Sequence, residues 1–277
     1  MKLGYNTNGW GCHRWDQAFE LIAELGYQSV AITVDHHCLD PYSADLPRQI
    51  DAIRQALERW QLSSVIETGA RFLLNPRVKH DPTLVSATAH ERKRRVDYLC
   101  RCVEIASEVG SEAVSFWSGT VADDASNDVA LQRLAEGCQA VCEEAERSRM
   151  RLAFEPEPGM FIDSFSRFRQ LRELVPAPCF GLTIDIGHVH CIEDEPISDY
   201  LREWRELIFN VHIEDMMRGV HEHLRFGEGE INFPPVLRTL EEIGYAGGVH
   251  VELSRHSHMA PTVAREAYDF LRNCLKS

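Results

Sequence analysis

The chain has 277 residues, and its 44% hydrophobic and 26% charged residues are typical of a globular protein with a substantial core. Its 29 basic and 43 acidic side chains give a formal net charge of −14, which opposes binding to the phosphates of nucleic acids. No apolar run approaches the roughly 20 residues that span a bilayer, and the first residues lack the apolar core of a signal peptide. We therefore expect a cytoplasmic protein with no membrane partner.

Short runs rich in β-branched and apolar residues alternate eight times with longer helical patterns. In chain order, the predicted pairs of strand and helix are 3–6 with 15–25, 29–34 with 46–60, 63–67 with 85–109, 113–117 with 128–147, 151–155 with 164–174, 180–185 with 197–204, 208–213 with 233–243, and 248–253 with 261–275. The connection that follows the third strand, residues 68–82, is unusually long for such a unit.

Strict alternation of strands and helices predicts parallel strands that close into a single (β/α)8 TIM barrel. We expect this barrel to form one domain over residues 1–277, with an extended loop between the third strand and the third helix. A doubly wound open sheet is the alternative. It is disfavoured because no Gly-x-Gly-x-x-Gly turn follows the first strand.

Each of the last four predicted strands ends in a side chain that can bind a metal, namely Glu155, Asp185, His212 and Glu252. Functional residues of such barrels lie at the carboxyl ends of the strands, so these four side chains should face one mouth of the barrel. Carboxylates that follow apolar strand residues are costly unless a cation pairs with them. Three carboxylates and one imidazole predict a site for a divalent ion such as Mn²⁺, Mg²⁺, Co²⁺ or Zn²⁺.

At these residues the sequence resembles the sugar phosphate isomerase/epimerase family of the xylose isomerase-like TIM barrel superfamily. The resemblance covers essentially the whole chain and rests on motifs that occur in the family's order. These are Glu-Pro-Glu at 155–157, Asp-x-Gly-His at 185–188, His-x-x-Asp at 212–215, Gly-Glu-Gly-Glu-Ile at 227–231, and the final Glu252.

The resemblance implies roles for particular residues. Glu155, Asp185, His212 and Glu252 match the family's metal ligands, and the two glutamates match its proton-transfer pair. His188 and Arg218 match residues that bind the substrate. His221 and His223 lie where related abasic-site endonucleases have a metal-binding pair, which suggests a second metal or an outer contact to the first.

Three further side chains are candidates from their positions near strand ends. Trp117 ends the fourth strand and offers an aromatic face to a sugar ring. Arg71 follows the third strand and suits a carboxylate or phosphate group. Glu157 follows the fifth strand and either orients a metal ligand or lies in a hydrated loop.

We expect an isomerase or epimerase of a sugar or polyol, working through a metal-stabilised enediolate and the two glutamates. The alternatives are an inosose-type dehydratase or lyase, an abasic-site endonuclease, and a barrel that binds a metabolite without turnover. The endonuclease is disfavoured because the third and fourth strands end in Glu67 and Trp117 instead of the expected histidines. Relatives of this kind are often homodimers or homotetramers, and we expect no nucleic-acid partner.

Overall fold

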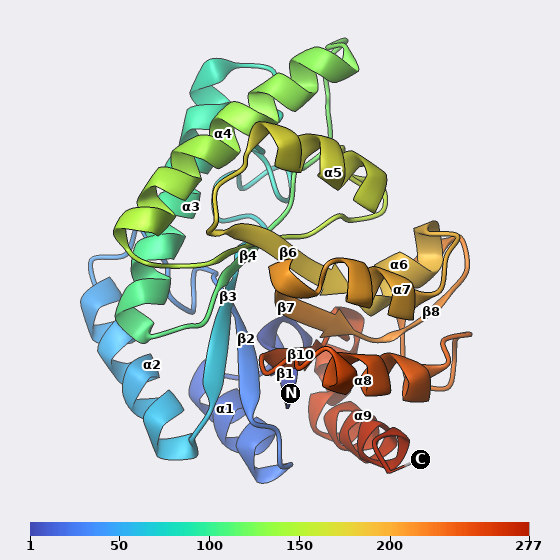
Figure 1. The fold of residues 1–277 in the computed structure, drawn as a ribbon. Coiled ribbons are helices and arrows are strands. Elements are labelled where there is room, and N and C mark those ends of the chain that lie inside the picture. Colours follow the sequence, from blue (N-terminus) through green and yellow to red (C-terminus); the bar gives the residue numbers. More distant parts are fainter. Residues whose placement is uncertain (277) are drawn as a thin grey trace.

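The computed structural model describes residues 1–276 and confirms the predicted TIM barrel. Eight parallel strands close in the order β1-β10-β7-β6-β5-β4-β3-β2, and helices surround them (Figure 1). The strands of the barrel are β1 (Lys2–Asn6), β2 (Ser29–Thr33), β3 (Ser63–Glu67), β4 (Val114–Phe116), β5 (Leu152–Phe154), β6 (Phe180–Asp185), β7 (Ile208–Ile213) and β10 (Gly248–Val251).

With the exception of α6, the α-helices follow the strands as the sequence pattern predicts. They are α1 (Trp15–Glu24), α2 (Leu46–Trp60), α3 (Ala89–Val109), α4 (Asn127–Arg147), α5 (Phe165–Leu174), α6 (Ile186–Ile192), α7 (Ile197–Glu203), α8 (Phe233–Glu242) and α9 (Ala260–Cys274). Within residues 1–276, none of the helices combines the length and the apolar character that crossing a membrane requires.

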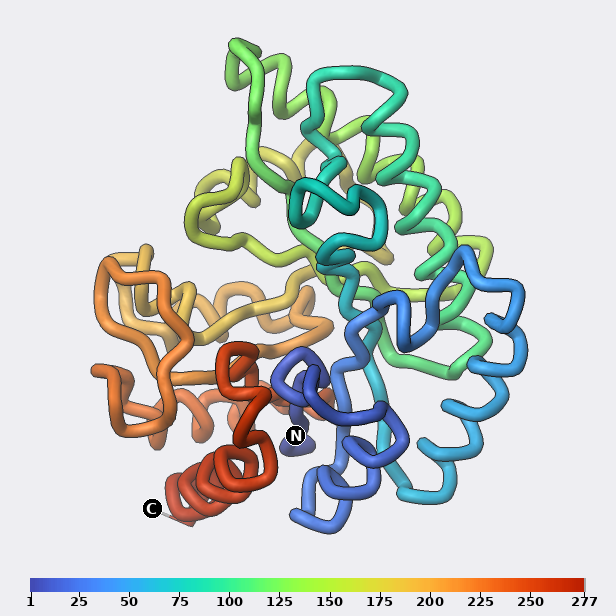
Figure 2. Tube along the Cα trace, turned by 180° about the vertical axis from the view of Figure 1, so that it is seen from behind, coloured from blue at the N-terminus to red at the C-terminus, as the bar shows by residue number. Residues whose placement is uncertain are grey.

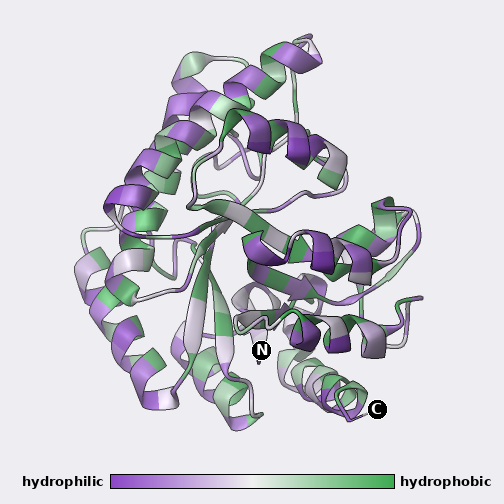
Figure 3. Ribbon diagram, viewed as in Figure 1, coloured by the Kyte–Doolittle hydropathy of each residue, from purple (hydrophilic) through white to green (hydrophobic). Residues whose placement is uncertain are grey.

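The barrel buries its strands on both faces. In β2 and β6 every residue is buried, since one face meets the barrel interior and the other meets the surrounding helices. Hydrophobic and hydrophilic residues alternate along the helices (Figure 3), and the buried positions of α2, for example, are Ile50, Ile53 and Leu57. Four buried phenylalanines pack between β4, β5, β6 and α5, at positions 116, 154, 168 and 180.

Two short elements that the sequence pattern did not predict lie beside the carboxyl ends of the strands. Helix α6 starts directly after β6, where the side chain of Asp185 accepts a hydrogen bond from the backbone N–H of His188 at 2.8 Å. Strands β8 (Asp215–Met217) and β9 (Val220–Leu224) form an antiparallel hairpin that turns at Gly219, whose φ is +72°. This hairpin carries His221 and His223 towards α6.

The extended loop between β3 and α3 spans residues 68–88 and is the teal segment of the tube in Figure 2. Helix α3 begins four residues later than the apolar pattern predicts. The reason is a capping box, in which Thr88 and Glu91 satisfy each other's backbone N–H groups. The loop therefore has its own structure and reaches over one side of the barrel mouth.

Candidate active site

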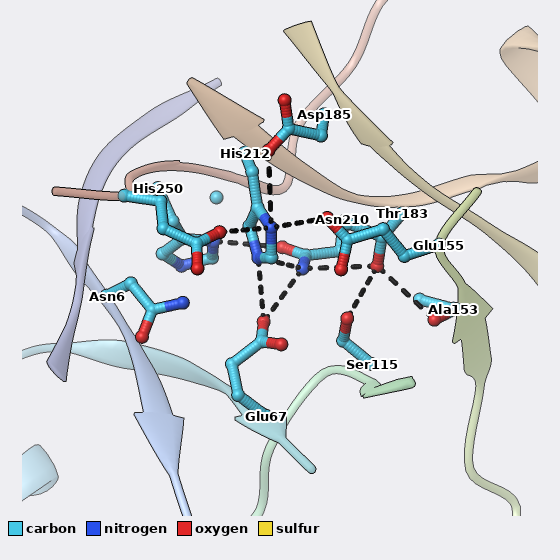
Figure 4. A network of polar contacts seen from close by, with 12 residues as sticks. Asn6, Glu67, Ser115, Ala153, Glu155, Thr183, Asp185, Asn210, His212 and His250 are labelled. Atoms are coloured by element: carbon cyan, nitrogen blue, oxygen red, sulfur yellow. Dashed lines mark hydrogen bonds and ion pairs between the residues drawn. The ribbon is translucent and has the colours of Figure 1, made fainter. Parts of the chain in front are cut away.

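Four side chains from separate strands converge at the carboxyl ends of β5, β6, β7 and β10. They are Glu155, Asp185, His212 and Glu252, and a ligand atom of each lies within 4.8 Å of the others. His212 Nδ1 lies 2.9 Å from Glu252 Oε2, 3.1 Å from Glu155 Oε1 and 3.9 Å from Asp185 Oδ2. Figure 4 shows the imidazole of His212 in the middle of the surrounding carboxylates.

Three carboxylates around one buried imidazole require a positive charge among them. Asp185 is almost wholly buried, and its Oδ2 has no hydrogen-bond partner within the described part of the chain. A buried carboxylate oxygen without a partner is costly unless a cation compensates for its lost hydration. Carboxylate oxygens and one imidazole nitrogen at this spacing form a donor set for a divalent metal. The residues present therefore fit such an ion.

Two of these four groups, Glu155 and His212, hold protons when no cation is present. Burial raises the pKa of Glu155 to about 8. Burial alone would lower the pKa of His212, but the charges of Glu67, Glu155 and Glu252 outweigh it and raise that pKa well above its usual range. For Glu252 the attraction of His212 outweighs burial and lowers the pKa far below its ordinary value. A divalent ion would have to displace the protons of Glu155 and His212.

A cavity of about 190 Å³ opens onto this group. Its walls include Glu155, His212 and Glu252, together with the predicted substrate-binding residues His188, Trp117 and Arg71. Lys79 also lines it and makes no hydrogen bond or ion pair with any residue in 1–276. The cavity is thus acidic on the side of β5 to β10 and basic along the loop between β3 and α3.

The basic side of the cavity is held in place by neighbours outside it. Arg71 Nη1 lies 3.3 Å from Oδ2 of the buried Asp35, which leaves its other N–H groups available. Trp117 has the guanidinium of Arg95 4.8 Å from its ring centroid and the ring of His80 5.2 Å away. Trp117 is therefore a fixed aromatic wall of the cavity.

Three histidines form a second cluster beside the first. His188 Nε2 lies 3.0 Å from His221 Nε2, which lies 3.4 Å from His223 Nε2. Burial lowers the pKa of His188 to about 3 and also lowers that of His221, so both are neutral imidazoles near pH 7. Neutral imidazoles can bind a metal, and the ligand atoms of these three histidines lie within 4.8 Å of one another. A further overlapping set with the same spacing consists of Asp185, Glu214 and His223.

The two remaining predicted residues lie in different surroundings. Glu157 lines the cavity, where burial and the charge of Glu155 raise its pKa well above its usual range. Arg218 is absent from the cavity wall. Its guanidinium donates to the backbone oxygens of His190 and Glu193 and pairs with Asp194 at 2.9 Å. In this conformation the structure does not bring Arg218 to the predicted substrate.

Two residues for which the sequence pattern predicts no role contact the predicted metal ligands. Glu67 Oε1 lies 2.9 Å from His212 Nε2, and Asn8 Nδ2 donates to Glu252 Oε1 at 2.7 Å. The position of Glu67 at the end of a barrel strand was an available signal, because the four predicted ligands were found by the same criterion. Asn8 lies in the short 3-10 helix η1 (Thr7–Trp10) and gave no comparable signal.

The family model described as xylose isomerase-like TIM barrel matches residues 19–274. L-ribulose-5-phosphate 3-epimerase UlaE of Salmonella typhi is 26% identical over 240 residues, which are 86% of this chain and 82% of that protein. The corresponding protein of Escherichia coli strain SMS-3-5 is 24% identical over 241 residues, with the same coverage of both chains.

Solved structures show the same fold at lower identity. The apo form of 3-keto-D-glucoside 4-epimerase YcjR from E. coli has a TM-score of 0.82 and 18% identity, covering 99% of this chain and all of that one. A structure of L-ribulose 3-epimerase has a TM-score of 0.79 and 18% identity, covering 99% and 94%. The IOLI protein, solved with a bound zinc atom, has a TM-score of 0.79 and 17% identity, covering 100% and 98%.

Proposed function

The chain belongs to the xylose isomerase-like TIM barrel family, and on this premise we propose that it is a divalent-metal-dependent isomerase or epimerase of a sugar or polyol-type substrate. One observation carries the proposal. Four strand-end ligands meet at a cavity, and the buried Asp185 Oδ2 among them has no hydrogen-bond partner within residues 1–276, while the imidazoles of His188 and His212 lie 3.8 and 3.9 Å from it. The relatives named as L-ribulose-5-phosphate 3-epimerase support a sugar as the substrate.

Glu155, Asp185, His212 and Glu252 would hold the metal. When bound, a divalent ion acts as a Lewis acid that makes a proton on the carbon next to a carbonyl easier to remove. Glu155 and Glu252 both line the cavity, so both carboxylates are within reach of a bound substrate. One of them takes the proton from carbon, and the other returns a proton.

The place where the proton returns determines the product. Return to the opposite face of the same carbon inverts that centre and gives an epimer. Return to the neighbouring carbon, together with transfer of the hydroxyl proton to the former carbonyl oxygen, exchanges the carbonyl and hydroxyl positions and gives an aldose–ketose isomer. In both cases the substrate loses one proton and regains one, so its mass does not change.

The remaining cavity walls fit the rest of such a substrate. His188 would bind a hydroxyl or carbonyl oxygen, and the fixed ring of Trp117 would pack on the apolar face of the carbon chain. Arg71, together with the unpaired Lys79, offers positive charge at the end of the cavity formed by the loop between β3 and α3. This charge favours a substrate with an anionic group at that end, such as a sugar phosphate or a sugar acid.

The cluster of His188, His221 and His223 is the proposed place for a second cation. Its donors are imidazoles, which suit Zn²⁺ better than Mg²⁺. The measurement is the metal content of the purified protein before and after dialysis against a chelator. About one ion per chain would argue against a second cation, and about two would support the second site.

The function is tested by incubating the protein and Mn²⁺ in D₂O with a panel of ketoses, aldoses, their phosphates and inososes. We expect a stereoisomer or positional isomer of one substrate that carries deuterium from the solvent, detected by NMR and mass spectrometry. Loss of water from the substrate would instead identify a dehydratase. The absence of any deuterium incorporation across the panel would contradict the proposal.

A further inference from the structure

Glu67 contacts a different imidazole nitrogen of His212 from the one that the other carboxylates contact. It ends β3, it is only 8% exposed, and its Oε1 lies 2.9 Å from His212 Nε2. The other imidazole nitrogen, Nδ1, is the one that faces Glu155, Asp185 and Glu252. Figure 4 shows Glu67 and Asp185 on opposite sides of the ring of His212.

This contact determines which nitrogen of His212 carries the proton in the neutral ring. A neutral imidazole has one N–H group and one lone pair, and an ionised carboxylate can only accept a hydrogen bond. Glu67 therefore places the proton on Nε2 and leaves the lone pair on Nδ1. Nδ1 is the nitrogen that a cation among the three other carboxylates requires.

A neighbouring amide favours the opposite arrangement. Asn210 Nδ2 lies 3.1 Å from the same His212 Nε2, and an amide nitrogen can only donate. If it donated to Nε2, the proton of the ring would sit on Nδ1 and point at the carboxylates. That tautomer cannot bind a cation through Nδ1.

Asn210 is fixed in this orientation by the interior of the barrel. Its Oδ1 lies 2.9 Å from His250 Nδ1, and both residues are completely buried. Its Nδ2 therefore points towards Glu67 Oε1, at 3.1 Å, and His212. Glu67 takes the amide hydrogen bond and also accepts from His212. A bond to a carboxylate is about twice as strong as one between neutral groups, so Glu67 prevails.

We propose that Glu67 is a positioning residue that selects the cation-binding tautomer of His212 against the competing amide of Asn210. The inference rests on the proposed function, because it assumes that His212 is a metal ligand. It adds a residue of β3 to a site whose four metal ligands come from β5, β6, β7 and β10. It also explains why a carboxylate stands at a position buried among polar groups of the barrel interior.

The test exchanges the carboxylate and the amide without changing their number. Co²⁺ is titrated into the wild-type protein, Glu67→Gln and the double variant Glu67→Gln/Asn210→Asp, and both the affinity and the visible absorption bands of the bound Co²⁺ are recorded. We expect Glu67→Gln to bind Co²⁺ about 10–100-fold more weakly, since loss of an outer contact to a ligand has an effect of that size. The double variant should recover most of the affinity, because the carboxylate that it introduces at position 210 then accepts from Nε2.

Ser115→Ala is the matched control, because Ser115 is bonded to Thr183 in the same polar network and does not touch His212. It should bind Co²⁺ like the wild type. Circular dichroism and thermal unfolding check that each variant is folded; if the double variant is not, the recovery arm uses Glu67→Asp, which keeps the carboxylate.

Three results would overturn the inference. The first is that Glu67→Gln keeps the wild-type Co²⁺ affinity and spectrum. The second is that the folded double variant binds Co²⁺ no more tightly than Glu67→Gln. The third is that Ser115→Ala loses as much Co²⁺ affinity as Glu67→Gln. In each of these cases the wild-type protein still binds Co²⁺, so the proposed function survives. A wild-type protein that binds no Co²⁺ would instead overturn the metal centre itself.

Discussion

At the residue scale, Glu155 and Glu252 combine two roles, since each is a proposed metal ligand and a proposed proton carrier. Glu155→Gln and Glu252→Gln keep the size of the side chain and remove its ability to exchange a proton. We expect each to lower the rate of deuterium exchange into substrate by about 10²–10⁴-fold, the usual contribution of a positioned acid or base. The rates are measured at saturating Mn²⁺, so that weaker metal binding is separated from lost proton transfer.

Glu112→Gln is the control for this pair. Glu112 pairs with Lys2 at the amino-terminal end of the barrel strands, away from the cavity. Its variant should exchange deuterium at the wild-type rate. If Glu155→Gln and Glu252→Gln also did so, their assignment as the proton-transfer pair would be wrong.

The protons held by the metal-free site predict how cation binding depends on pH. Burial raises the pKa of Glu155 to about 8, and the surrounding carboxylates raise that of His212 despite its burial. Below pH 8 the cation must therefore displace protons, and its apparent affinity should rise with pH between 6 and 8, by at most about tenfold per pH unit for each proton displaced. Calorimetry of Mn²⁺ binding in two buffers with different ionisation enthalpies measures the protons released.

The sign of this effect distinguishes the metal site from simple surface binding. Exposed carboxylates are already ionised at pH 6, so a cation bound to them would show little change in affinity up to pH 8. A pH-independent affinity with no proton release would contradict the protonated state that the burial of Glu155 and the charges around His212 indicate.

At the scale of the elements, α6 packs directly over a buried carboxylate. A Cβ atom at Gly187 would lie 2.1 Å from Glu214 Oε1 and 2.7 Å from Met216 Cε, and Glu214 is fully buried. Gly187→Ala should therefore displace the helix or the carboxylate and destabilise the protein by about 1–3 kcal/mol. Thermal unfolding should show a loss of about 2–4 °C for each kcal/mol.

Gly11→Ala is the matched control for this substitution. A Cβ there meets nothing closer than 3.6 Å, and the φ of Gly11 is −58°, which any residue adopts. Its melting temperature should stay within about 1 °C of the wild type. If both variants lost the same amount of melting temperature, the close contacts of a Cβ at position 187 with Glu214 and Met216 would not be the cause of the destabilisation.

The loop between β3 and α3 carries the prediction about the substrate's charge. Arg71→Met and Lys79→Met remove positive charge from the cavity and keep long side chains. Each should lower kcat/KM for a sugar phosphate or sugar acid by about 10–100-fold, which corresponds to the free energy that a hydrogen bond to a charged group contributes. A neutral sugar of the same skeleton is the control and should be little affected. Equal losses on the charged and neutral sugars would contradict an anion-binding role.

The elements show which features of the fold could be predicted from sequence. The predicted bounds of β3, β6 and β7 match the structure, because each is a short run with β-branched residues between longer helical patterns. Helix α6 was missed because it has only seven residues and follows β6 without a turn. The β8–β9 hairpin was missed because its exposed residues do not alternate between apolar and polar.

Part of the site could also be predicted from the sequence. Glu155, Asp185, His212 and Glu252 could be grouped because barrel closure brings strand ends together. The contact between Glu67 and His212 joins residues 145 positions apart and depends on how far each side chain reaches across the barrel. The position of Arg218 depends on the course of the chain after β8, which no local pattern specified.

At the scale of the whole molecule, one end of the barrel concentrates charge of both signs. The carboxylates of β5 to β10 face the basic side chains of the loop after β3 across one cavity, while the chain as a whole has a net charge of −14. A small anionic or neutral sugar fits this arrangement better than a nucleic acid, whose phosphates the overall charge would repel. The oligomeric state stays a prediction, and light scattering of the purified protein would measure it.

The central claim is that Glu155, Asp185, His212 and Glu252 bind one divalent cation. Anomalous diffraction from crystals grown with Mn²⁺ tests this claim most directly, because it locates the ion without reference to any activity. We predict an anomalous peak bonded to a side-chain atom of all four residues, with His212 contributing Nδ1. The absence of a peak there at saturating Mn²⁺, or a peak only among His188, His221 and His223, would contradict it.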